Sequence, residues 1–129
     1  MTVSEALLNC ISAALDGHAC ALTLAPDDWT ALLRLAGEQK LLPLVYAAVR
    51  GTPGFAAAPD AVRAAARRQT MREAAAQTVH TEAFLRLYQA LRAEGLAPVV
   101  VKGIVCRALY PQPELRPSSD EDLYLTAAE

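Results

Sequence analysis

The segment that most limits how this chain can fold is residues 60–94, because it contains neither glycine nor proline. Pro59 precedes it and Gly95 follows it, and these residue types commonly begin and end a helix. The segment therefore predicts one long helix with at most one break. Its first half is rich in alanine and arginine, whereas its second half carries an apolar stripe that we expect to pack more tightly. The stripe consists of Val79, Phe84, Leu87, Tyr88 and Leu91.

Three shorter helices are predicted before this segment. Apolar residues recur at steps of three and four over residues 3–16, which predicts an amphipathic helix with Ser4 as its candidate cap. A proline followed by two aspartates predicts the start of a second helix over residues 26–40, because acidic groups stabilise a first turn. Residues 42–50 predict a third helix, closed by a turn rich in glycine and proline.

The pattern changes after Gly95. Residues 97–101 form a short β-branched run that predicts a buried strand, and residues 104–110 predict about two turns of helix. Prolines at positions 111, 113 and 117 then exclude regular structure, and residues 122–126 predict a second strand. We therefore expect a mostly helical α+β fold.

Length, charge and cysteine content narrow the class of protein. We expect the 129 residues to form one compact unit, with a helical region over residues 1–95 and a strand, helix and strand over residues 96–129. The net charge of −2 argues against a general nucleic-acid-binding protein. The odd number of cysteines, 3, favours free thiols and a cytoplasmic location. No apolar run is long enough to cross a bilayer and no basic leader is present, so neither membrane insertion nor secretion is expected.

Two acidic residues, Asp120 and Asp122, stand at the entrance to the second predicted strand. Because side chains alternate along an extended chain, we expect both on one face and Glu121 on the other. Two carboxylates on one face suit Mg²⁺, which combines one or two carboxylates with waters and substrate phosphates. Taken alone, such a pair is more often a solvated part of a loop or strand edge.

Lys102 and Gly103 lie between the first predicted strand and the short helix. A glycine there lets backbone N–H groups approach a phosphate closely, and the lysine ammonium can meet the same charge. If the two strands are antiparallel, these residues converge with Asp120 and Asp122 at one edge of the sheet. The alternative is that Gly103 is only a turn and Lys102 only a surface charge.

Four motifs follow one another near the C-terminal end of the sequence. They are Lys102-Gly103, Leu109-Tyr110-Pro111, Leu115-Arg116-Pro117 and Asp120-Glu121-Asp122-Leu123. In this order and spacing they resemble an uncharacterised bacterial nucleotidyltransferase family of the DNA polymerase beta superfamily. Trp29 and the run at residues 41–44 are also similar to that family, although the specific part of the resemblance covers about residues 99–125.

The resemblance implies that residues 96–129 form the start of a nucleotidyltransferase palm. It implies that Asp120 and Asp122 bind the metal and are catalytic, and that Lys102, Gly103 and Arg116 contact the phosphate or nucleotide. The implied reaction is the Mg²⁺-dependent transfer of a nucleotidyl group from a nucleoside triphosphate to an acceptor hydroxyl. The sequence does not identify that acceptor.

Three departures from the family pattern bear on activity. Ile104 follows the glycine where serine or glycine is common, and Glu121 stands where an apolar residue is usual. The superfamily has a third carboxylate on a later strand, for which this sequence offers only Glu129. We therefore expect a truncated nucleotidyltransferase-like protein, and the alternative is a catalytically incomplete module that acts through protein–protein interaction. Two strands alone leave unpaired edges, which favours a homodimer or a partner chain that completes the sheet.

The remaining polar residues are interpreted as structural. His80, in the long predicted helix, is expected at the boundary of the core and not as a base. The arginines of residues 63–72 are expected to form a solvated helix face. His18 lies near Cys10 and Cys20, but their spacing fits no standard zinc site.

Overall fold

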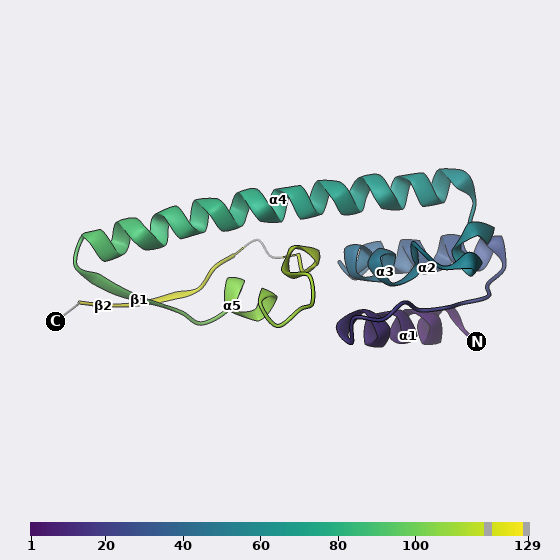
Figure 1. Ribbon diagram of the computed structural model, residues 1–129, viewed down its shortest axis with the longest axis horizontal. Coiled ribbons are helices and arrows are strands. Elements are labelled where there is room, and N and C mark those ends of the chain that lie inside the picture. The colour runs from purple at the N-terminus through teal and green to yellow at the C-terminus, as the bar shows by residue number, and fades with distance from the viewer. Residues whose placement is uncertain (118–119, 128–129) are drawn as a thin grey trace. The chain divides into compact units, whose positions relative to one another are not determined.

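The computed structural model describes residues 1–117 and 120–127 (Figure 1). It is a mostly helical α+β protein, which confirms the predicted fold class. Contacts divide the chain into unit 1, Met1–Glu73, and unit 2, Ala74–Glu129. The boundary lies within the long helix α4 (Asp60–Ala93), so this helix contributes residues to both units.

Unit 1 consists of helices whose limits match the predicted ones closely. They are α1 (Val3–Leu15), α2 (Pro26–Glu38), α3 (Leu42–Val49), the 3-10 helix η1 (Pro53–Ala57) and the first part of α4. The residue that caps α1 is Thr2 and not Ser4. The Thr2 hydroxyl accepts the Glu5 N–H at 3.1 Å, and the Glu5 carboxylate accepts the Thr2 N–H at 2.7 Å. This reciprocal pair satisfies two backbone donors that the first turn leaves unpaired.

The core of unit 1 lies where the apolar faces of α1, α2 and α3 meet. Trp29 and Val45 are completely buried there. Phe55 of η1 packs edge to face against Trp29, with 5.3 Å between the ring centroids. Each large apolar side chain buried in this way contributes roughly 1.5–3 kcal/mol, so unit 1 has a conventional hydrophobic core.

Unit 2 combines the second part of α4 with two strands and two short helices. In chain order these are β1 (Leu96–Val100), α5 (Ile104–Arg107), the 3-10 helix η2 (Pro113–Leu115) and β2 (Leu123–Ala127). The strands are antiparallel, and Val100 is paired with Leu123. Helix α5 is shorter than the two turns expected, because Leu109 and Tyr110 donate to carbonyls three residues earlier and so form turns instead of further helix.

The second half of α4 is less buried than its apolar stripe predicted. Phe84 is 6% exposed, but Val79 is 65% exposed and Leu87 is 50% exposed. The buried cluster of the described residues lies in unit 1, so the expectation that the second half packs more tightly is wrong. The physical reason is that the described residues of unit 2 supply only two short strands and one-turn helices to cover this part of the helix. Neither α4 nor any other described helix combines the length and apolar character needed to cross a membrane.

Candidate nucleotide and metal site

Strand pairing places the end of β1 beside the start of β2. Beyond the last strand pair, the Val101 N–H donates to the Asp122 carbonyl at 3.1 Å. Lys102 is the residue after Val101, and Asp120 and Asp122 lie in the segment just before β2. The antiparallel arrangement therefore brings the lysine and the aspartates to the same end of the sheet.

Lys102 and Asp122 form an ion pair at this end of the sheet. Lysine Nζ is 3.0 Å from Asp122 Oδ2, and the two side chains are 61% and 49% exposed. The hydrogen bond to Asp122, together with the charges of Asp122 and Asp120, raises the pKa of Lys102, while Arg116 acts in the opposite direction. Two carboxylates and Arg116 thus act on the Lys102 ammonium, although an exposed ion pair such as Lys102–Asp122 contributes little to stability.

The side chains of the acidic segment alternate as expected. Asp120 and Asp122 are exposed, whereas the Glu121 side chain is only 6% exposed. No group of three or more metal-binding side chains occurs among residues 1–117 and 120–127. The donor set therefore does not form a closed protein site for a metal. A pair of exposed carboxylates does fit Mg²⁺, which completes its coordination with waters and substrate phosphates.

Gly103 lies close to a side chain from the acidic segment. It has a φ of 70° and a ψ of −108°, a conformation that favours glycine. A Cβ atom added at Gly103 would stand 1.9 Å from Glu121 Oε2. The space beside this glycine is therefore filled by a carboxylate of the same chain.

The Glu121 carboxylate is held by three groups from two helices. Its oxygens accept the Ile104 N–H at 2.8 Å and an Arg107 Nη2–H at 2.9 Å, and His80 Nε2 lies 3.2 Å away. The Arg107 side chain is 3% exposed, and its Nη1–H donates to Gln77 Oε1 at 2.9 Å. The sequence showed Glu121 where an apolar residue is usual, but it did not identify these partners. The available signal was that a buried carboxylate requires a basic partner.

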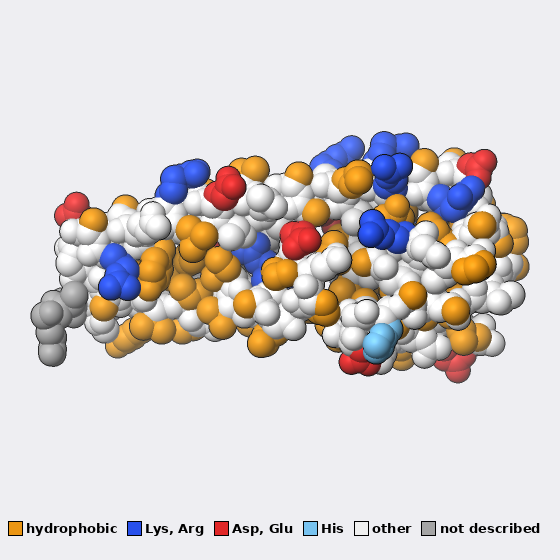
Figure 2. All heavy atoms as spheres, viewed as in Figure 1, with side chains coloured by type: hydrophobic (Ala, Val, Ile, Leu, Met, Phe, Trp, Pro, Cys, Tyr) orange, Lys and Arg blue, Asp and Glu red, His pale blue; other side chains and the backbone are white. Residues whose placement is uncertain are grey.

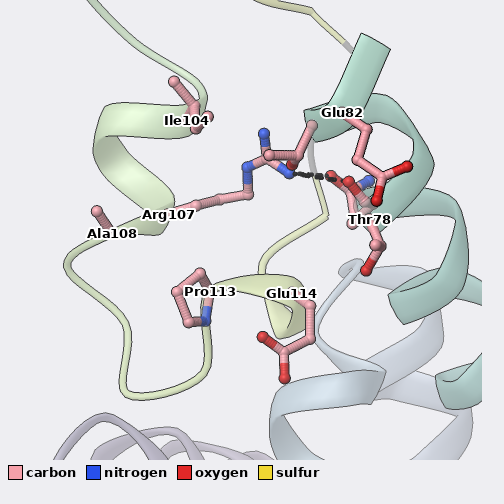
Figure 3. A pocket seen from close by; sticks show the side chains of 9 residues that line it. Thr78, Glu82, Ile104, Arg107, Ala108, Pro113 and Glu114 are labelled. Carbon is pink, nitrogen blue, oxygen red and sulfur yellow. Dashed lines mark hydrogen bonds between the residues drawn. The ribbon is translucent and has the colours of Figure 1, made fainter. Parts of the chain in front are cut away.

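A cavity of about 340 Å³ lies on another side of Arg107 within unit 2. Its walls come from α4, α5 and η2, and Figure 3 shows Arg107 reaching from α5 toward α4 between Ile104 and Thr78. The lining residues are Gln77, Thr78, Thr81, Glu82, Ile104, Arg107, Ala108, Pro113 and Glu114. The exposed residues Lys102, Asp120 and Asp122, called the charged cluster below, are not among them. The cavity is therefore distinct from the charged cluster.

The sequence that contains this charged cluster matches a known protein family. A family model described as an uncharacterised nucleotidyltransferase matches residues 25–129. The match includes the strands, α5 and the charged residues of this site. No curated protein and no solved structure matches the chain. The family match covers most of the sequence, and the chain therefore belongs to this uncharacterised nucleotidyltransferase family.

Proposed function

We propose that the protein transfers a nucleotidyl group from a Mg²⁺-bound nucleoside triphosphate to an acceptor hydroxyl, with release of pyrophosphate as the bond between the α- and β-phosphates breaks. The observation that carries the proposal is the charged cluster at the end of the sheet where β1 ends and β2 begins, called the open end below. Asp120 and Asp122 are both exposed there, and Lys102 lies 3.0 Å from Asp122. All three residues lie within the region that the nucleotidyltransferase family model matches.

Each residue of the cluster has a chemical role in the proposed reaction. Asp120 and Asp122 would hold Mg²⁺, which when bound neutralises charge that develops on a transferred phosphate. Lys102 places positive charge beside Asp122, and the charge of Arg116 acts on Lys102, so we assign both cations to the binding of the triphosphate. Gly103 is not assigned a direct phosphate contact, because the Glu121 carboxylate fills the adjacent space.

Calorimetric titration of Mg²⁺-ATP, and then of the other nucleoside triphosphates, onto the intact chain tests this proposal. Asp120→Asn and Asp122→Asn are each expected to weaken binding by roughly tenfold or more, as for loss of a contact to a charged group. Asp27→Asn is the matched control, because Asp27 is an exposed aspartate in α2 of unit 1. Lack of metal-dependent binding by the intact chain would contradict the proposal. Binding by both site variants as tight as that of the intact chain would also contradict it.

A second candidate function is an interaction module that does not catalyse the reaction. It is favoured by the lack of a third metal-binding side chain near the aspartates in the described residues. It is also favoured by exposed apolar residues on the strands: Val99 is 51% exposed, Tyr124 63% and Leu125 48%. Figure 2 shows apolar side chains on the surface of this part of unit 2. Such a surface, beside unpaired strand edges, suits a second copy of the chain or a partner chain that completes the sheet.

A further inference from the structure

Glu121 stands between the two aspartates of the proposed metal site, yet its side chain points into unit 2. We propose that Glu121 is a positioning residue that fixes the backbone of residues 120–122 and so holds both aspartates at the open end of the sheet. Only the claim that this positioning serves metal binding rests on the proposed function. The contacts of the Glu121 carboxylate, called the anchor below, are described by the structure itself.

The anchor joins the acidic segment to two helices. The carboxylate accepts a backbone N–H of Ile104 at 2.8 Å and an N–H of the Arg107 guanidinium at 2.9 Å. His80 of α4 lies 3.2 Å from the same oxygen that Arg107 contacts. Hydrogen bonds to a charged group are stronger than neutral ones, and burial increases their electrostatic strength. Three such contacts therefore restrict the Glu121 side chain to one position.

Fixing Glu121 also fixes its neighbours, because successive side chains of an extended chain point to opposite sides. With the glutamate directed inward, both aspartates are directed outward, and both are exposed. The Asp122 carbonyl is held separately by the Val101 N–H at 3.1 Å. The segment is thus held by a side chain on one side and by the strand ladder on the other.

Gly103 supports the same interpretation. The Glu121 carboxylate approaches so closely that any Cβ at position 103 would meet its atoms, the nearest at 1.9 Å. The glycine therefore allows the carboxylate to reach the Ile104 N–H. In this chain the Lys-Gly turn receives an internal carboxylate, and this contact links the turn after β1 to the aspartates before β2.

The competing explanation is that the Glu121–Arg107 pair only stabilises unit 2. A buried ion pair can often be replaced by apolar residues with little loss of stability, whereas removing one partner is strongly destabilising. A double replacement, Glu121→Leu with Arg107→Leu, therefore separates stability from positioning. It removes both buried charges, and it also removes the acceptor for the Ile104 N–H.

The experiment compares Glu121→Gln, Glu121→Leu and this double variant with the intact chain. Glu94→Gln, an exposed glutamate after α4, is the matched control. Two quantities are measured: amide hydrogen exchange at Val101 and Ile104, and Mn²⁺ affinity from its electron paramagnetic resonance signal. Thermal melting shows whether each variant is folded, and amides of β2 report on the strand pairing.

We expect all three Glu121 variants to exchange faster at Val101 and Ile104 while β2 stays protected. We expect their Mn²⁺ affinity to fall by about 10- to 100-fold, the usual effect of losing an outer partner of a metal ligand. The double variant is expected to regain the melting temperature without regaining the Mn²⁺ affinity. Glu94→Gln should match the intact chain in every measurement.

Recovery of both the melting temperature and the Mn²⁺ affinity in the double variant would overturn the inference, because packing alone would then position the aspartates. Tighter Mn²⁺ binding by Glu121→Gln would also overturn it. If the intact chain binds no Mn²⁺, the proposed function fails first. Hydrogen exchange at Val101 then still decides whether Glu121 holds the acidic segment, so the two failures are distinguishable.

Discussion

Three successive acidic residues have different environments within one short segment. A buried carboxylate is tolerated only when it is paired and hydrogen-bonded, and Glu121 meets this condition through Arg107 and the Ile104 N–H. Asp120 and Asp122 remain in contact with water. The difference follows from the direction in which each side chain points, since all three carry the same charged group.

The buried thiol of Cys10 also has an environment that changes its chemistry. Burial, and then the neighbouring Cys20, raise the pKa of Cys10 from 9.0 to about 12. The thiolate is the reactive form, so we expect iodoacetamide at pH 8 to modify the half-buried Cys106 well before Cys10. Mass spectrometry of the modified peptides measures both rates. Equal rates in the folded protein would contradict this assignment.

The same pKa shift has a definite sign for stability. The unfolded chain releases the Cys10 proton above about pH 9, whereas the folded chain keeps it until about pH 12. The stability contributed by the protonated thiol is therefore fully present below about pH 9 and is lost as the pH rises toward 12. Urea unfolding across this range measures the decline, and Cys10→Ala is expected to make it less steep.

The surroundings of a side chain could be predicted from the sequence only where they follow from alternation along a strand or from strand pairing. Alternation fixed the relative directions of Asp120, Glu121 and Asp122. Strand pairing then explained why Lys102 lies near Asp122. Arg107 could not be assigned to Glu121 in this way, because their contact depends on how α5 packs and not on a repeat in the sequence.

Among the elements, α4 shows most clearly that forming a helix and burying it are separate events. The absence of glycine and proline was sufficient to predict the helix. The apolar stripe of its second half did not predict burial, because unit 2 offers little surface to cover it. An amphipathic pattern states which face is available for packing, and the other elements decide how much of that face is used.

Two substitutions in the second half of α4 test this uneven burial. Phe84→Ala is expected to lower the free energy of unfolding by about 3 kcal/mol, because it removes a buried ring. Val79→Ala is expected to change it by less than about 0.5 kcal/mol, because the valine is mostly exposed. Urea unfolding followed by signals from unit 2 measures both values. Similar losses for the two variants would show that the exposed side of α4 is packed in solution.

The strands and α5 were predicted with different success. The β-branched run of residues 97–101 and the apolar run of residues 122–126 were sufficient to predict both strands, and the structure confirms the strands with antiparallel pairing. The expectation that the first strand is buried is wrong, because Val99 is 51% exposed on the described sheet of two strands. The short helix was predicted too long, because apolar residues after Arg107 continue a helical pattern that the chain does not follow. Turn hydrogen bonds and the prolines that follow end it early.

For the molecule as a whole, the exposed strand surface leads to a prediction about association. If this surface binds a second copy of the chain, the average mass in light scattering should rise with protein concentration. Tyr124→Lys should reduce that rise by placing a charge on the exposed apolar surface. Leu8→Lys is the control, because Leu8 is an exposed apolar residue of α1. A monomeric mass at every concentration would contradict self-association.

The sequence by itself determined the helices, the two strands, the alternation of the acidic segment and the membership of a nucleotidyltransferase family. These properties depend on local periodicity and on motifs, which involve residues that are close together in the sequence. Only the tertiary structure decided that Glu121 is buried against Gly103 and paired with Arg107 and His80. The reason is physical: a buried charge needs partners from distant parts of the chain, and folding alone brings those partners together.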